Sequence, residues 1–365
     1  MATMLLDFDS QGDVILLVGN RPDDGTTEAT SGSKFLSIVN MGVSMSTVKL
    51  KVSSKKLIAS SPCFEAMLDG SHKEAQELRD SGTTEINLCG PEDDPEAMII
   101  IMGILHGTGS DIKPPNTTNL FLLEKIVDLT DKYQCHAVVL NSARQWADKL
   151  YNLEGLPTTL NPDLLSWLWI SWVLGLQSHF QTLSAVAMRT TIGPMSLTDE
   201  SIKVPERVVT QMNDKRRWAF SQLEQAADQL LEDLMKQNCP LPSTDDRSDD
   251  ENLGLYLTKC AILGYSSAQF QKLKISDVDG SSVAAIQEAV GNLYDFDPNY
   301  NYYRKYQSSR TREDFVSLLQ QCPQWNLKKR LQEVLDGLDN MTLGLDYETL
   351  RPPHLDATHP PGISV

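Results

Sequence analysis

Residues able to bind a metal ion or to perform nucleophilic chemistry are scattered along this sequence. A zinc site can be constructed from Cys239, Cys260 and Cys322 with His354 or His359. Zinc sites that are recognisable from sequence carry cysteines in close pairs, and these three cysteines form no such pair. We therefore expect isolated thiols here and no bound metal ion.

Two other combinations resemble catalytic pairs and have simpler explanations. Cys135 and His136 are adjacent, and neighbours on a helix point in different directions, so a cysteine–histidine pair is not expected. Asp93 and Asp94 can be paired as catalytic acids, but they stand directly before Pro95, which suits the first turn of a helix. An acidic residue at that place caps the helix, so the pattern predicts capping and no acid–base catalysis.

Motifs for phosphate binding, nucleotide binding or hydrolysis do not occur in the chain. It contains no GxxxxGK[ST], GxGxxG, HExxH or GxSxG sequence. The GTGSD stretch at Gly107–Asp111 lacks the strand–lysine–helix context of a phosphate loop and predicts a turn that ends a helix. The basic stretch DKRRW at Asp214–Trp218 is short and fits a solvated helix face. We expect no enzymatic activity and no catalytic, cofactor-binding or metal-binding residue.

Composition excludes several classes of partner. The 365 residues carry a net charge of -17 at pH 7, which argues against binding to nucleic acid or to an anionic membrane. The Trp-rich run Leu164–Leu176 is shorter than the roughly 18 apolar residues that a membrane span needs, so it predicts a buried helix. The N-terminus carries no basic segment ahead of its short apolar run, so no export signal is expected. Cytoplasm or nucleus is the expected location, with the six cysteines reduced.

Short strands alternate with polar stretches in the first part of the chain. Asp13–Gly19 predicts a buried strand, Ser46–Ser54 a half-buried strand and Thr84–Gly90 a third, while Phe35–Val39 is a candidate hairpin partner. Three stretches without apolar periodicity are expected to be exposed and sensitive to proteases: Asp23–Ser33, Asp69–Gly82 and Pro240–Asp250.

Helices are predicted between and after these strands. Ser61 and Pro62 are typical of a helix start, so Lys51–Leu68 predicts two short helices joined by a sharp corner. A third helix begins after Asp94 and ends at Gly107, and two more follow over Asn119–Tyr133 and Cys135–Leu150. This order indicates an α+β domain, a small sheet wrapped by helices. The predicted core is Leu57, Phe64, Met98, Ile101 and Leu105.

Four stretches follow one another in the order, and near the spacing, of a BTB/POZ domain. They are DVILLVG, KLKVSSKKLIASSPCFEAML, EINLCGPEDDPEAMIIIMGILHG and IVDLTDKYQCHAVVLNSARQWADKL. The chain thus resembles BTB/POZ proteins, more narrowly the fungal BTB-domain proteins with a helical C-terminal extension. The resemblance covers residues 10–150 and implies a protein-interaction module rather than an enzyme. Asp13 matches the family's early aspartate, whereas Ser53 stands where many members have a histidine, which puts a groove like that of BTB transcription factors in doubt.

The remainder of the chain is predicted to be mainly helical. Residues 151–238 are expected to form a helical extension, loosely similar to the BACK region, with Pro205 starting one helix and Phe220–Leu234 forming another. An acidic linker rich in Pro, Ser and Asp covers 239–251, a small helical region covers 252–340, and 341–365 is expected to be a disordered tail.

Three functions from different classes follow from these patterns. The first is a module that self-associates as a homodimer and binds protein partners; the second is a substrate adaptor that binds a cullin scaffold of a ubiquitin ligase. The third, an enzyme within 252–338, has no motif behind it. The candidate interface residues are apolar residues of the N-terminus and the first helices: Met4, Leu5, Leu6, Leu57 and Met67. The alternative is that Met4–Phe8 packs on its own domain or is disordered.

Overall fold

The computed structural model describes residues 4–19, 47–107, 114–196, 202–236, 263–264, 266–293, 326–338 and 343–351. These residues form two compact units. The first falls within Met1–Leu156, Leu165–Leu176 and Arg351–Val365, and the second within Pro157–Leu164 and Gln177–Leu350. The expected hairpin strand Phe35–Val39 and the linker 239–251 lie outside the described residues.

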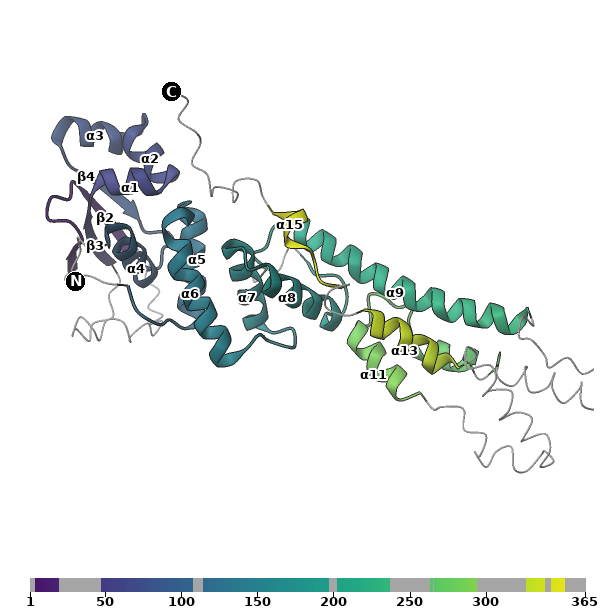
Figure 1. Ribbon diagram of the computed structural model, residues 1–365. Coiled ribbons are helices and arrows are strands. Elements are labelled where there is room, and N and C mark those ends of the chain that lie inside the picture. Colours follow the sequence, from purple (N-terminus) through teal and green to yellow (C-terminus); the bar gives the residue numbers. More distant parts are fainter. Residues whose placement is uncertain are drawn as a thin grey trace, which may run out of the picture. The chain divides into compact units, whose positions relative to one another are not determined.

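The first unit is built on a small mixed sheet (Figure 1). Its strands are β1 (Met4–Asp7), β2 (Val14–Gly19), β3 (Thr47–Val52) and β4 (Thr84–Leu88), in the spatial order β1-β3-β2-β4. β2 runs antiparallel to β3 and parallel to β4, and β3 runs parallel to β1. The three strands predicted from sequence are therefore confirmed, and the N-terminal apolar segment adds a fourth.

Alternation along the strands creates the inner face of this sheet. Successive side chains of a strand point to opposite faces, so every second residue is buried. Apart from Thr84 and Gly19, the buried positions of the four strands are all large and apolar: Leu6, Val14, Leu16, Val18, Val48, Leu50, Val52, Ile86 and Leu88. Helices cover this inner face, as Figure 1 shows.

The predicted corner between two short helices is confirmed. Helix α1 (Ser54–Ser60) ends at Ser61, which then caps α2 (Pro62–Asp69) by accepting a hydrogen bond from Phe64 N over 3.1 Å. Pro62 occupies the first position of α2, where its missing N–H would have no partner in any case. Ser61 also donates from its hydroxyl to the carbonyl of Tyr133, which fastens the corner to the far end of another helix.

The stretch Asp69–Gly82 is mostly exposed, as predicted, but it also forms a helix that its lack of apolar periodicity did not indicate. It contains α3 (Lys73–Ser81), a helix whose side chains are mostly exposed and which buries Ala75. Strong helix formers such as Lys, Glu, Gln and Leu stabilise it without an apolar stripe. Gly82 ends the helix with φ of 74°, a left-handed conformation that glycine adopts without steric cost.

Three longer helices complete the core of the first unit. They are α4 (Pro95–His106), α5 (Leu120–Lys132) and α6 (His136–Glu154). α4 lies between the sheet and the pair α5 and α6, so it is buried on most sides. The predicted core is confirmed for Leu57, Phe64, Met98 and Ile101, whereas Leu105, near the end of α4, is only half-buried.

The Trp-rich segment forms the buried helix that its composition predicted. Helix α7 (Pro162–Leu174) buries all three of its tryptophans, and its residues from Leu165 onward belong to the first unit. Trp169 donates from its indole N–H to Asp128 on α5 over 2.8 Å, which satisfies the polar group of a buried aromatic side chain. These tryptophans are core residues of the fold.

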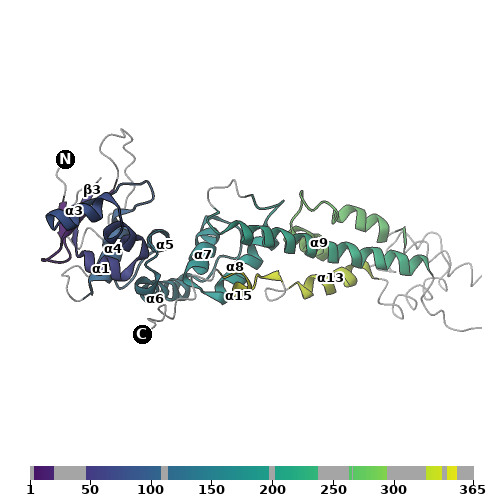
Figure 2. The same ribbon diagram turned by 90° about the horizontal axis from the view of Figure 1, so that it is seen from above.

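Among the described residues of the second unit, helices are the regular secondary structure. It contains α8 (Gln177–Thr190), α9 (Glu206–Met235), α11 (Val283–Gly291), α13 (Leu327–Gly337) and α15 (Tyr347–Leu350). α9 begins after Pro205 as predicted, but it continues for 30 residues, so the two helices expected there are one. α13 runs alongside α9 in both ribbon views (Figure 2).

Two expected boundaries differ from the structure. Segments assigned to separate regions, 151–238 and 252–340, contribute α8, α9, α11 and α13 to one compact unit. Residues 343–351, expected in a disordered tail, are ordered and bury Leu343, Leu345, Tyr347 and Leu350. Within the described residues, no helix is both long and apolar enough to cross a lipid bilayer.

Candidate functional site

The five candidate interface residues occupy different environments. Leu5 is the most accessible, with 55% of its side chain exposed, and Met67 on α2 is half-buried. Leu6 points into the core, and Met4 pairs through its backbone with Val48, its side chain lying outside the description. Leu57 is 0% exposed, so its side chain packs inside its own domain, as expected for a core residue, and is not accessible at the surface.

β1 is an edge strand of the described sheet. It pairs with β3 on one side, and no other described strand lies beside it. Its inward residue Leu6 and the following Phe8 are buried, and its outward residues Leu5 and Asp7 are exposed. The N-terminal segment therefore packs on its own domain with one face, and its other face lies at the edge of the described sheet.

The outer face of the sheet carries two rows of residues in register. One row runs Leu5, Lys49, Leu17 and Asn87 across the four strands, and the next runs Asp7, Lys51, Ile15 and Glu85. Lys49 and Glu85 form an ion pair over 2.8 Å that spans the central strand β2. Both partners are well exposed, so this pair contributes little to stability. The pair places a charged side chain on each side of the half-buried Ile15 and Leu17 of β2.

The start of α1 is capped by residues from distant parts of the chain. Its own N-cap residue, Ser53, makes no capping bond with its side chain. Asp13 instead accepts hydrogen bonds from Ser54 N over 2.7 Å and from Ser54 Oγ over 2.6 Å. The N–H of Ser53 donates to Nε2 of His106, at the end of α4, over 3.1 Å.

His106 therefore places an imidazole beside position 53, where the family resemblance expects a histidine and the chain has serine. The second ring nitrogen, Nδ1, lies 2.9 Å from the carbonyl of Met102. Burial lowers the pKa of His106, and the ammonium of Lys56 adds to that effect, while the Met102 carbonyl and the Asp9 carboxylate act in the opposite direction. Sequence reasoning missed this residue, because no motif connects positions 53 residues apart.

An ion pair also connects the segment that follows β1 to the surroundings of His106. Lys56 of α1 lies 3.3 Å from Asp9, which follows β1, and its ammonium also donates to the carbonyl of His106 over 3.4 Å. Phe8 packs its ring against the imidazole, with ring centroids 5.8 Å apart. The end of β1, the start of α1 and the end of α4 thus meet around His106.

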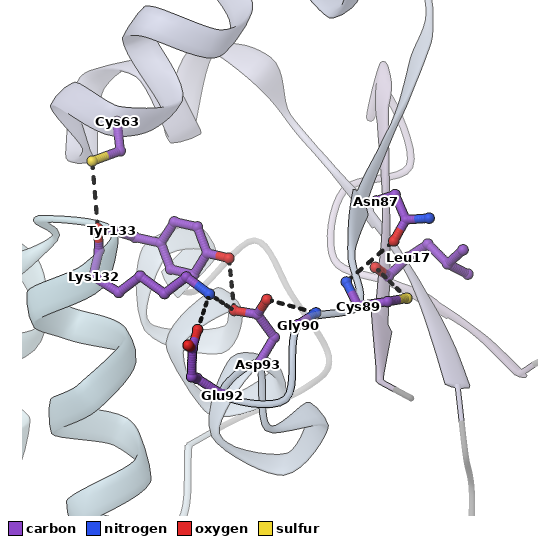
Figure 3. A network of polar contacts seen from close by, with 9 residues as sticks. All are labelled: Leu17, Cys63, Asn87, Cys89, Gly90, Glu92, Asp93, Lys132 and Tyr133. Carbon is purple, nitrogen blue, oxygen red and sulfur yellow. Dashed lines mark hydrogen bonds and ion pairs between the residues drawn. The ribbon is translucent and has the colours of Figure 1, made fainter. Parts of the chain in front are cut away.

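A polar network lies at the other end of α4, in the turn that leads into the helix (Figure 3). The carboxylate of Asp93 accepts hydrogen bonds from Lys132 Nζ over 2.8 Å, from Tyr133 OH over 2.8 Å and from Gly90 N over 3.1 Å. Glu92 binds the same lysine over 2.9 Å. Asp94 caps α4 by accepting from Ala97 N over 2.9 Å. The predicted capping is therefore confirmed for Asp94, whereas Asp93 binds Lys132, Tyr133 and the backbone of Gly90.

Two of the described thiols, Cys63 and Cys135, are poorly suited to nucleophilic chemistry. Together with Cys89 they are cysteines that form no disulfide. Burial raises the pKa of Cys135 to about 12 and also raises the pKa of Cys63, whose Sγ lies 3.5 Å from the Lys132 carbonyl (Figure 3). A thiol with a raised pKa is protonated at neutral pH and is a weak nucleophile. No cluster of three or more potential metal ligands occurs among the residues with defined positions; Cys239, Cys260, Cys322, His354 and His359 lie outside them.

Comparison with known proteins adds no relative. No protein-family model matches this chain, and neither the curated proteins nor the solved structures contain a significant match.

Proposed function

We propose that this chain is a non-enzymatic protein-interaction module of the BTB/POZ type that self-associates through the edge strand β1. The observation that carries the proposal is that β1 has one buried face and one exposed face. Leu6 and Phe8 fix the strand on its domain, while Leu5 remains 55% exposed at a sheet edge. Exposed edge strands with apolar residues pair readily with other chains.

The charges around the edge favour a second copy of the chain as the partner. The outer face presents Lys49 and Lys51 beside Asp7 and Glu85, so it carries both signs. A two-fold contact places the same patch against itself, and a patch with both signs can match its own copy. Pairing of two β1 strands would extend the sheet across the dimer and cover Leu5.

The polar clusters of the described residues support the same reading. Asp13 and His106 hold the start of α1, and Asp93 holds the end of α5 to the turn before α4. Each cluster satisfies backbone groups or helix ends of this fold. A structural role therefore accounts for both clusters, and neither needs a substrate to explain it.

Sedimentation velocity of the full chain tests the proposal. Concentrations of roughly 1 to 100 µM cover the range in which a dimer of moderate affinity dissociates. Leu5→Asp should shift the dimer to monomer, because burying a leucine contributes about 1.5–3 kcal/mol, roughly tenfold or more in affinity. Leu153→Asp is the matched control: this leucine is 78% exposed and lies outside the sheet, at the end of α6. Its variant should dimerise as the original chain does.

Two results would contradict self-association through β1: a monomeric original chain at 100 µM, about the upper end of that range, or a Leu5→Asp variant that still dimerises. A monomer that retains a cullin scaffold in a pull-down would support the adaptor function instead. An experimental structure of the first unit tests the BTB/POZ resemblance itself.

A further inference from the structure

His106 joins three segments that are far apart in the sequence. Its imidazole accepts from the backbone of Ser53 at the start of α1, packs against the ring of Phe8 at the end of β1, and is bonded to Met102 within α4. The side chain is 4% exposed. Its surroundings are therefore protein atoms, and any change in the ring has to be accommodated by these partners.

The hydrogen bonds define which nitrogen of His106 carries a hydrogen. A backbone N–H can only donate, so Nε2, which faces Ser53 N, must offer its lone pair. The carbonyl of Met102 can only accept, so Nδ1 must carry the hydrogen. The folded arrangement thus requires the neutral imidazole, in the tautomer protonated at Nδ1.

Protonation at Nε2 is incompatible with this arrangement. The added hydrogen would point at the N–H of Ser53, so two donors would face each other and the bond would be lost. The imidazolium would also lie near the ammonium of Lys56, and Asp9 is the acidic group that offsets it. Of the other charged groups on these segments, Asp13 binds Ser54, and Lys51 binds the carbonyl of Ser10 and lies near Asp7.

We propose that His106 is an acid-sensitive latch on the start of α1. When Nε2 takes up a proton from solvent, Ser53 loses its acceptor, and the junction between α1, α4 and the Phe8–Asp9 segment opens locally. Asp13 still holds Ser54, so the opening involves the end of β1 and the first turn of α1 rather than the whole domain. The latch is a property of the first unit and does not depend on self-association.

The sign of the pH dependence follows from the depressed pKa of His106. Below the ordinary histidine pKa of about 6.5, the unfolded or opened chain binds a proton that the closed fold resists. The stabilisation by His106 is therefore complete above that pH and is lost as the pH falls toward the lower pKa of the closed state. The closed junction should persist at neutral pH and open in mild acid.

Hydrogen–deuterium exchange of the full chain at three pH values tests the latch. The values are pH 7.5, 6.5 and 5.5, which extend about one unit to either side of the ordinary histidine pKa. Rates are corrected for the intrinsic pH dependence of exchange. Peptides covering residues 4–9 and 51–57 should lose protection in acid by up to about tenfold per pH unit below the ordinary histidine pKa, and the loss should level off as the closed-state pKa is reached. Peptides of α5 should not change in this way. His106→Gln places a neutral acceptor near Nε2 and should abolish this pH dependence. The control His72→Gln, at an exposed histidine before α3, should retain it.

A measurement on the unmodified chain covers the case in which His106→Gln does not fold. The ring nitrogens of His106 should show the Nδ1–H tautomer by ¹⁵N NMR, and the Ser53 amide shift should change with the same midpoint as the ring. The latch is overturned if the ring is protonated at pH 7.5, about one unit above the ordinary value, or if Ser53 does not follow its titration. Equal loss of protection in His106→Gln and in the original chain would overturn it as well.

Discussion

Tyr133 donates a hydrogen bond from its phenol to Asp93 across 40 positions of sequence, over 2.8 Å. The same tyrosine stacks its ring on Phe64 with centroids 5.0 Å apart, and its carbonyl accepts from Ser61. One residue at the end of α5 therefore fastens both the corner between α1 and α2 and the turn before α4. Burial and the neighbouring Asp93 carboxylate raise the pKa of the Tyr133 phenol, so it remains a donor across the physiological range.

Tyr133→Phe should destabilise the first unit without changing its fold. The variant keeps the ring stack on Phe64 but removes one hydrogen bond to the buried Asp93 carboxylate, and bonds to charged groups contribute about 1.5–3 kcal/mol. Hydrogen exchange of α4 amides in increasing urea reports the stability of this unit alone. Tyr151→Phe, at a more exposed tyrosine on α6, is the control and should change stability by less than about 0.5 kcal/mol.

Phe64→Ala should remove a larger part of the stability. Phe64 is fully buried on α2, and truncating such a ring costs about 3–5 kcal/mol because the cavity does not fully collapse. Phe121→Ala, at a phenylalanine 57% exposed on α5, is the matched control. The same urea-dependent exchange should separate the two variants; similar values for both would show that α2 does not pack as described.

Local sequence signals predicted the parts of the fold that depend on neighbouring residues. Ser61 and Pro62 define a helix start whatever the rest of the chain does, and the alternation of Val48, Leu50 and Val52 defines a strand. Helix α3 has no apolar stripe, so periodicity does not predict it, although its composition favours a helix.

Contacts between distant segments could not be predicted in this way. The cap that His106 provides for Ser53 depends on how α4 lies beside α1, and no spacing in the sequence encodes it. Leu57 was expected both in the core and at an interface, because an apolar residue on a short helix suits either until its neighbours are known. The segment 343–350 contains LGLDYETL, whose apolar residues alternate, but the prolines that follow suggested disorder.

Glu96 should give the first unit an opposite pH dependence to that of His106. Burial, with the nearby Asp94 carboxylate, raises the pKa of Glu96 to about 7. The folded state therefore binds a proton that the unfolded chain releases above its ordinary value near 4.5. The stabilisation by protonated Glu96 is present in acid and is lost as the pH rises through about 7.

Glu96→Gln should consequently be more stable than the original chain at pH 8, and this gain in stability should shrink toward pH 5. These two pH values lie about one unit or more on either side of the pKa of Glu96. Thermal unfolding across this range provides the measurement. Glu65→Gln, at an exposed glutamate in the first turn of α2, is the control and should show no such trend. A gain for Glu96→Gln that is independent of pH would contradict the raised pKa.

Leu345→Ala should destabilise the second unit, because residues 343–350 are part of its core. Leu345 is buried, and its backbone N–H donates to Ser184 on α8 over 2.9 Å; Lys215 on α9 donates to the neighbouring carbonyl of Gly344 over 2.8 Å. Truncating a buried leucine costs about 2–5 kcal/mol. Exchange of α8 amides in urea should show that loss, with Thr349→Ala, at an exposed position of α15, as the control.

Limited proteolysis gives an independent check of the same segment. If residues 343–350 are docked, cleavage in the original chain should spare them, and Leu345→Ala should expose them to the protease. The Phe180 ring meets Tyr347 edge-on at 5.7 Å, so Tyr347→Ala should act in the same direction. Cleavage within 343–350 at equal rates in the original chain and both variants would restore the expectation of a disordered tail.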